Sequence, residues 1–216
     1  MSGDDYSSAF PDTALARTAH TYLTGIAPTS LVNHSLRSYL FARAIGDHQG
    51  LHADADYDDE LLFLGCALHD IGLTDEGDGE QRFEVDGADL ATRFLIGNGL
   101  DEDRAAIVWD AIALHTSQGI ANRKRPEIAL THSGIGADIF GLHADLLPEG
   151  HGLSVHADYP RLDLGRDMAD IIVAQATAKP HKAPPFTFPG GVLQERSPKS
   201  AVPGYAQLLA ACPWES

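Results

Sequence analysis

Cysteine is scarce in this chain, which has only Cys66 and Cys212 among its 216 residues. Small disulfide-stabilised folds need a dense cysteine framework, so the composition argues against that class. Cys66 lies inside the apolar run LLFLGCAL, and we therefore expect it to be a buried free thiol. The length suits one medium-sized domain with a full core.

Long hydrophobic runs are also missing. No stretch approaches the roughly 20 apolar residues that span a bilayer. The first ten residues, MSGDDYSSAF, are acidic and lack the basic and apolar regions of a secretory signal. Apolar residues make up 44% of the chain and charged residues 21%, as in an ordinary soluble protein. We therefore expect a cytoplasmic protein with no membrane partner.

Basic residues are few: Lys and Arg number 15 against 31 Asp and Glu, which gives a net charge of -16. Such a surface repels phosphate backbones and anionic membranes. The charge argues against a nucleic-acid partner and against a highly anionic substrate, and it favours a small molecule. It does not decide the oligomeric state, and a homo-oligomer stays open.

The alternation typical of β-strands is absent, and so is any internal repeat or dividing linker. Apolar residues recur at helical spacing instead. We predict an all-α protein in which the helices cover residues 12–24, 31–48, 58–72, 84–97, 101–116, 126–141, 160–178 and 204–211.

The ends of the chain have a different composition from its centre. We predict a disordered N-terminus at 1–11, one helical domain at 12–178, and a tail or lid at 179–216 that carries the short terminal helix. The tail is rich in Pro and Gly at 179–200, where we expect irregular, extended chain. Two aromatic residues there have little core to join, and one interpretation is that they cover a pocket: Phe186 and Phe188.

The doublet His69-Asp70 closes an apolar helical run and places a nitrogen donor beside an oxygen donor. Burying both is costly unless a charged or hydrogen-bonding group lies between them, and a divalent metal ion would satisfy both. Further candidate ligands lie on or at the ends of predicted helices, as in helix-bundle metal sites: His34, His115 and Asp138. The alternative is a chance pair in which Asp70 caps the next turn.

The order His34, His69-Asp70, Asp138 resembles the HD superfamily of metal-dependent hydrolases, and within it the cyanamide hydratase-like branch. The resemblance covers about residues 30–145. Its matching pieces are LHDIGLT at 68–74, Phe83-Glu84 shortly before Gly87, ALH at 113–115 and ADIFG at 137–141. After His115 this chain has Thr116-Ser117 where that branch carries larger polar residues, a departure that concerns the substrate rather than the metal.

The resemblance implies a single HD-type helical domain and one divalent metal held by His34, His69, Asp70 and Asp138. Zinc is expected first, with manganese and iron as alternatives that the same donors suit. A metal-bound hydroxide would attack a small neutral nitrile-like molecule, with the conversion of cyanamide to urea as the reference case. Protein-bound zinc can bring the pKa of its water to roughly 7, which makes such a hydroxide available near neutral pH.

The resemblance also makes His115 and Glu84 candidate catalytic residues. His115 would be a further ligand, a proton shuttle or a donor to the substrate; otherwise it is a histidine favoured at a helix end by the dipole. Glu84 would fix the tautomer of a ligand histidine or act as a general acid or base; otherwise it is a solvated residue at a helix start.

Two other functions stay open. An HD phosphohydrolase acting on a nucleotide or other small phosphate ester would need positive charge at its site, and few Lys or Arg flank the motifs. A metal-stabilised binding domain without turnover is the other. Arg37 could pair with Asp70, bind an anion or form a surface salt bridge. We expect Asp86 to be solvated and His132 to point away from the site.

Overall fold

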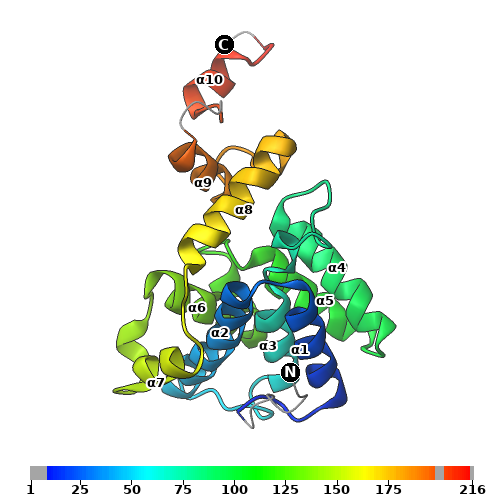
Figure 1. Ribbon diagram of the computed structural model, residues 1–216, viewed down its shortest axis with the longest axis vertical. Coiled ribbons are helices and arrows are strands. Elements are labelled where there is room, and N and C mark those ends of the chain that lie inside the picture. The colour runs from blue at the N-terminus through cyan, green and yellow to red at the C-terminus, as the bar shows by residue number, and fades with distance from the viewer. Residues whose placement is uncertain (1–8, 198–201, 215–216) are drawn as a thin grey trace.

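The computed structural model describes residues 9–197 and 202–214, which fold into helices joined by short loops (Figure 1). No strand occurs among these residues, so the all-α prediction is confirmed. The α-helices are α1 (Ala14–Ile26), α2 (Thr29–His48), α3 (Asp59–Leu68), α4 (Phe83–Gly97), α5 (Glu102–Leu114), α6 (Pro126–Phe140), α7 (His151–Asp158), α8 (Leu164–Ala178), α9 (Phe188–Arg196) and α10 (Tyr205–Ala210). Four 3-10 turns join them: η1 (Ile71–Leu73), η2 (Ala121–Arg123), η3 (Ala144–Leu146) and η4 (Pro180–Lys182).

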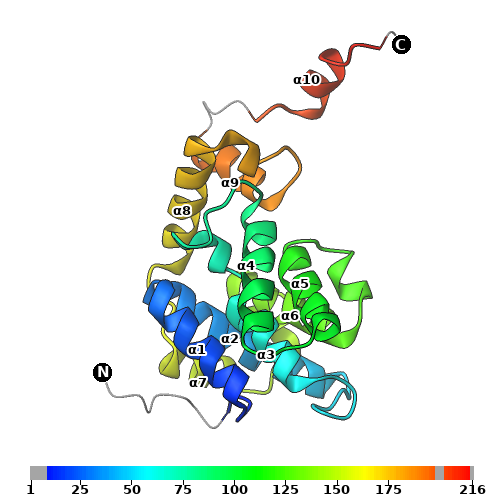
Figure 2. The same ribbon diagram turned by 90° about the vertical axis from the view of Figure 1, so that its right-hand side faces the viewer.

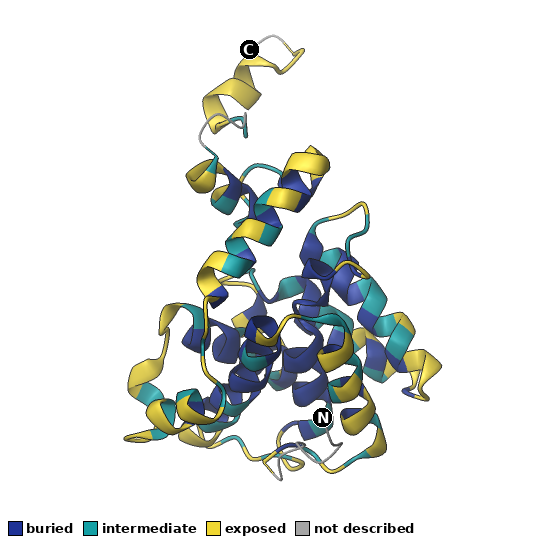
Figure 3. Ribbon diagram, in the orientation of Figure 1, coloured by how far each residue is buried: buried dark blue, intermediate teal, exposed yellow. Residues whose placement is uncertain are grey.

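Helix α3 lies at the centre of the molecule, where α1, α2, α5 and α6 pack around it (Figures 1 and 2). Its sequence DELLFLGCAL is apolar on every side, and all but one of its residues are buried (Figure 3). Asp58 caps its first turn by accepting a hydrogen bond from the Leu61 backbone N–H. Cys66 is a buried free thiol, as predicted, and burial raises its pKa to about 12.

Two glycines allow the close helix packing that brings the later site together. A Cβ on Gly134 of α6 would lie 2.1 Å from the backbone oxygen of Ser38 on α2. A Cβ on Gly72 of η1 would lie 1.9 Å from the backbone oxygen of Phe83, the first residue of α4. Neither position can therefore carry a side chain. The backbones of α2 and α6 are in direct contact at Gly134, and those of η1 and α4 are in direct contact at Gly72.

Parts of both ends of the chain that the structure describes hold packing and helices that the sequence did not predict. Residues 1–8 of the expected disordered N-terminus lie outside the described residues, but Phe10 is buried with its ring centroid 5.4 Å from that of Phe63. The expected extended segment at 179–200 instead holds η4 and α9, and α9 packs on α8. Helix α7 was not predicted at all. Helix α10 projects away from the body of the molecule (Figures 1 and 2).

Among the described residues, none of the helices has the length and apolar character needed to cross a membrane.

Candidate metal centre

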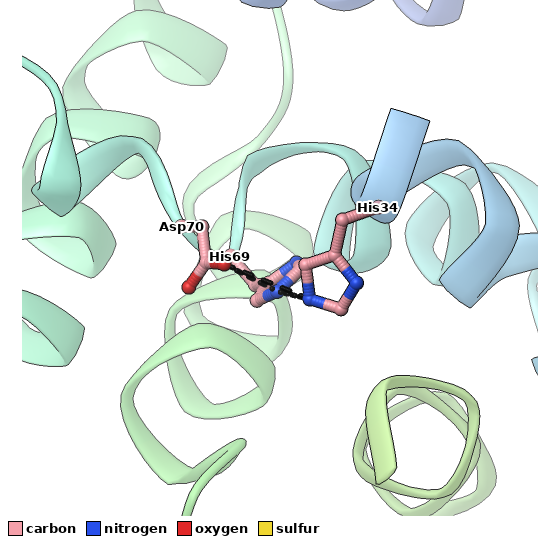
Figure 4. Close-up of side chains that lie close together, drawn as sticks. All are labelled: His34, His69 and Asp70. Atoms are coloured by element: carbon pink, nitrogen blue, oxygen red, sulfur yellow. Dashed lines mark hydrogen bonds and ion pairs between the residues drawn. The ribbon is translucent and has the colours of Figure 1, made fainter. Parts of the chain in front are cut away.

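Three donor side chains meet at the centre of the fold: His34 from α2, and His69 with Asp70 from the turn that ends α3 (Figure 4). The Nε2 atoms of the two histidines are 3.1 Å apart, and Asp70 Oδ2 lies 3.2 Å from His69 Nε2 and 3.6 Å from His34 Nε2. All three side chains are buried. Helix α3 ends at Leu68, so the doublet lies in the turn after the helix rather than in its last turn as expected.

Hydrogen bonds on the far side of each ring fix which nitrogen faces the cluster. His69 Nδ1 lies 2.8 Å from the backbone oxygen of Cys66, and His34 Nδ1 lies 2.6 Å from Asp138 Oδ2. Both partners are acceptors, so each Nδ1 carries a hydrogen, and in the neutral form of each ring Nε2 presents a lone pair to the cluster. Two nitrogen lone pairs and a carboxylate oxygen thus face one another at close range.

A divalent cation fits this donor set. Bonds of about 2.0–2.1 Å in tetrahedral geometry would place ligand atoms roughly 3.3 Å apart, which matches the observed spacing. Asp70 Oδ2 is also buried with no hydrogen-bond partner among the described residues. A cation between the three atoms would replace their mutual repulsion with attraction and would satisfy that oxygen.

The charges of the cluster are strongly coupled. Burial alone would raise the pKa of Asp70, but the neighbouring His69 outweighs it and holds that pKa well below its usual range. Burial would likewise lower the pKa of His69, yet the Asp70 carboxylate raises it. The pKa of His34 is lowered, mainly by burial. Asp70 is therefore a permanent anion at the centre of the fold.

Asp138, the fourth ligand expected from the sequence, lies on the opposite side of His34 from the cluster. Its carboxylate accepts two hydrogen bonds from Arg37, each of 2.7 Å, besides its contact with His34 Nδ1. Arg161 adds a contact to Oδ1 at 3.4 Å. Arg37 is fully buried, so it forms neither the surface salt bridge nor the pair with Asp70 that the sequence left open.

His115 lies beside the cluster at the C-terminal end of α5. Its Nδ1 lies 2.6 Å from the backbone oxygen of Ile112, and its Nε2 lies 3.7 Å from Asp70 Oδ1. Burial, together with the nearby His69, lowers its pKa to about 4. The ring is thus neutral near pH 7, and its Nε2 can accept a proton.

Glu84 is buried at the start of α4, which corrects the alternative that it is solvated. Its Oε1 accepts a 2.8 Å hydrogen bond from Thr116 Oγ1, and its carboxylate pairs with Arg82. Neither of these partners is a ligand histidine. Asp86, expected in solvent, is buried too, in an ion pair of 2.6 Å with Lys182.

A cavity of about 110 Å³ opens beside the donor cluster. Besides the three donors, the residues that line it are Phe83, His115, Thr116, Gln118, His132, Ile135, Gly136, Ile139, Phe140, Leu142, Met168 and Phe188. None of them is Lys or Arg, and more than half of this set is apolar. The cavity therefore suits a small, uncharged molecule.

Several of these lining residues were missed or misplaced from the sequence. His132 was expected to point away, yet it lines the cavity and its Nδ1 lies 2.7 Å from the backbone oxygen of His115. The spacing of His132, Ile135, Gly136 and Ile139 at i, i+3, i+4 and i+7 on α6 was the available signal, because such residues share one helix face. Phe188 lines the cavity, while Phe186 is exposed.

Comparison with known proteins agrees with this geometry. The HD domain family matches residues 31–149, a range that includes His34, His69, Asp70, Glu84, His115 and Asp138. Two relatives from Saccharomyces cerevisiae, cyanamide hydratase DDI2 and cyanamide hydratase DDI3, are each 27% identical in an alignment 183 residues long that covers 79% of this chain and 76% of the relative.

Proposed function

Because this chain belongs to the HD domain family and is a metal-dependent hydratase or hydrolase, we propose that it adds water to a small uncharged nitrile. Cyanamide, which the names of the two yeast relatives specify, is the reference substrate, and urea is its product. The chain is related to those enzymes over most of its length, but Thr116, the first residue of the Thr116-Ser117 departure, lines the cavity and bears on which nitrile is preferred.

One observation carries this proposal: the cavity that adjoins the donor cluster has no cationic lining residue among the described residues. Enzymes that act on phosphate esters place Arg, Lys or further metal ions around the transferring group to balance its charge. A nitrile brings no charge to balance. The small volume of about 110 Å³ also favours a small molecule over a nucleotide.

We propose that His34, His69 and Asp70 hold one divalent metal ion, with zinc favoured by two imidazoles and a carboxylate. When bound, the metal supplies the Lewis acidity that brings the pKa of a water to roughly 7. Asp138, fixed by Arg37, holds the Nδ1–H of His34 and so keeps the Nε2 lone pair directed at the cluster.

His115 is proposed to move the proton. Its neutral Nε2 accepts one hydrogen of the attacking water as the water oxygen bonds to the nitrile carbon. The same nitrogen then returns that proton to the substrate nitrogen, where one π-electron pair of the C≡N bond forms the N–H bond and the imidic acid results. The remaining O–H hydrogen then moves to that nitrogen, the second π pair forms its N–H bond, and the C=O of the amide forms. Both hydrogens of the water end in the product amide, so no other reactant is needed.

Glu84 is proposed to act through Thr116 rather than on the substrate. Its carboxylate accepts the Thr116 hydroxyl hydrogen, and Arg82 donates to the Thr116 oxygen at 3.4 Å, which leaves that oxygen one lone pair for a molecule in the cavity that Thr116 lines. An acceptor at that position can hold the N–H that forms on the substrate nitrogen.

The free thiols of Cys66 and Cys212 suit the reducing cytoplasm, which is where we propose that the protein works on its small-molecule substrate.

The deciding experiment combines elemental analysis of purified protein with an activity screen. Urea release from cyanamide is measured beside phosphate release from mononucleotides, with the metal-free protein as the control for both. We expect about one metal ion per chain and metal-dependent urea release. Metal-loaded protein that ignores cyanamide and every small nitrile but releases phosphate from a mononucleotide would show that the phosphohydrolase alternative is right.

A further inference from the structure

One wall of the cavity is built entirely from apolar side chains, and they come from separate parts of the chain. Phe83 begins α4, Phe140 ends α6, Met168 lies on α8 and Phe188 begins α9. The donor cluster and His115 line the same cavity, and the ring centroid of His115 lies 5.6 Å from that of Phe83. The reacting groups are therefore next to an aromatic and aliphatic surface.

Phe188 contacts two other aromatic residues of this apolar wall. Its ring centroid lies 6.4 Å from that of Phe83 and 6.5 Å from that of Phe140, with interplanar angles of 62° and 73°. Edge-to-face contacts of this kind are favourable and hold the rings in defined orientations. The aromatic part of the wall therefore depends on a residue far along the chain from the metal donors.

Helix α9 is fixed in place by buried contacts, so Phe188 is not on a loose tail. Thr187 caps the helix through a 3.2 Å hydrogen bond from the Gly190 backbone N–H, and Leu193 is buried against α8. The preceding η4 is tied to α4 by the buried Lys182, whose Nζ lies 2.6 Å from Asp86 Oδ2. These contacts therefore hold Phe188 in a fixed position at the cavity.

The amino group of cyanamide has no hydrogen-bond partner on such a wall, whereas an alkyl group would bury apolar surface there. We propose that the preferred substrate is a nitrile whose carbon carries a small apolar substituent, and that Phe188 determines this preference. The proposal rests on the nitrile hydration proposed above and narrows its substrate class. The nitrile end would face the cluster while the substituent lies against Phe83, Phe140 and Phe188.

The test measures kcat/KM of the metal-loaded protein for cyanamide, acetonitrile, propionitrile and butyronitrile, with amide or urea formation as the readout. Each added methylene should raise kcat/KM by about fourfold for as long as the group still fits, since each one buries apolar surface. Phe188→Ala should lower the butyronitrile-to-cyanamide ratio by about tenfold, and Phe188→Leu by less. Phe186→Ala is the matched control: Phe186 is exposed and does not line the cavity, so the ratio should not change.

A binding measurement separates failure of this inference from failure of the proposed function. Saturation-transfer NMR with butyronitrile reports contact with the wall whether or not the nitrile reacts, and circular dichroism checks that each variant is folded. If no nitrile is converted but butyronitrile binds and Phe188→Ala or Phe188→Leu weakens that binding, the apolar wall is supported and the hydration is wrong. If cyanamide is converted but longer nitriles gain nothing, or the folded Phe188 variants match the wild type, the inference is overturned.

Discussion

At the scale of single residues, the orientation of an imidazole ring depends on the helix end beneath it. His69 and His115 each follow the last residue of a helix, and each Nδ1 lies within hydrogen-bond distance of the backbone oxygen three residues earlier. The same tripeptide, Ala-Leu-His, ends both helices. A backbone carbonyl in the last helical turn thus selects the tautomer that points Nε2 inward.

Removing a donor should remove the metal. His69→Ala and Asp70→Ala are each expected to lose bound metal and activity together, because the remaining two donors form an incomplete site. Elemental analysis after dialysis measures this directly. The matched control is His52→Ala, since His52 is exposed and should leave metal content unchanged. Full metal occupancy in either donor variant would mean that the assigned ligands are wrong.

Proton transfer and positioning should be separable from metal binding. His115→Ala and Glu84→Gln are expected to keep most of the metal and to lose roughly 10- to 1,000-fold in kcat, as is usual for general acid–base and supporting groups. Thr116→Val should resemble Glu84→Gln, because it breaks the same hydrogen bond, and Thr116→Ser should restore activity. Wild-type turnover in the His115 and Glu84 variants would show that neither residue takes part in the reaction.

At the scale of helices, the site depends on how closely α2 and α6 approach. Arg37 and Asp138 meet across this pair although 101 residues separate them in the chain. Gly134 makes the approach possible because its missing side chain leaves room for the backbone of Ser38. The packing of these two helices therefore sets the position of His34 through the Asp138 carboxylate.

The glycine contact gives a stability prediction. Gly134→Ala should lower the free energy of unfolding by about 1–3 kcal/mol, because the added methyl group would overlap the Ser38 oxygen and push the helices apart. Gly165→Ala in α8 is the control: nothing lies within 4 Å of a Cβ there, so alanine should be neutral or stabilising by up to about 1 kcal/mol. Urea unfolding of both variants measures the difference, and equal stabilities would contradict the close packing.

The helices were predictable where one face is strongly apolar, and they were missed where it is not. Helix α2 is long and its larger apolar residues recur at helical spacing, whereas α7 is short and buries only Val155. Helix α9 is hidden in a Pro- and Gly-rich segment, where Pro189 is tolerated because it lies in the first turn. A local sequence pattern shows the helical spacing of apolar residues. It does not show the tertiary contacts that stabilise a short helix.

From the sequence, the metal donors could be predicted because they lie in recognisable motifs, but most of the rest of the site could not. His34, His69 and Asp70 meet as the sequence suggested. Of the aromatic lining, only Phe188 was offered from the sequence as a residue that covers a pocket; the meeting of Phe83 and Met168 could not be predicted, because tertiary packing between distant helices brings them together. Asp138 lies on the Nδ1 side of His34, where two hydrogen bonds from the buried Arg37 hold its carboxylate. No local sequence pattern indicates that Arg37 is buried.

At the scale of the whole molecule, the C-terminal helices are attached to the domain by a buried charge. Lys182 lies beneath the acidic loop before α4, with its Nζ 2.8 Å from Asp78 Oδ1 and 2.6 Å from Asp86 Oδ2. A cation there neutralises part of a chain whose net charge is -16. The pair therefore links the strongly acidic body to the element that carries Phe188.

Breaking this pair should destabilise the protein strongly. Lys182→Met should lower the free energy of unfolding by about 3–5 kcal/mol, because it leaves the Asp86 carboxylate buried without its partner. Adding Asp86→Asn to that variant should restore part of the loss. Lys124→Met, which breaks an exposed pair with Asp110, should cost no more than about 1 kcal/mol. Urea unfolding that gave the same cost for both lysines would show that Lys182 is not an anchor.

The order of these elements along the chain has a consequence for biosynthesis. A nascent chain that has emerged as far as the end of α3 already carries His34, His69 and Asp70, and one that has emerged as far as α6 also carries Asp138. Phe188 follows only with α9. Since segments fold from the N-terminus as they leave the ribosome, the donors for the metal are available before the cavity acquires its last wall. Metal capture by the nascent chain can therefore precede the completion of the substrate cavity.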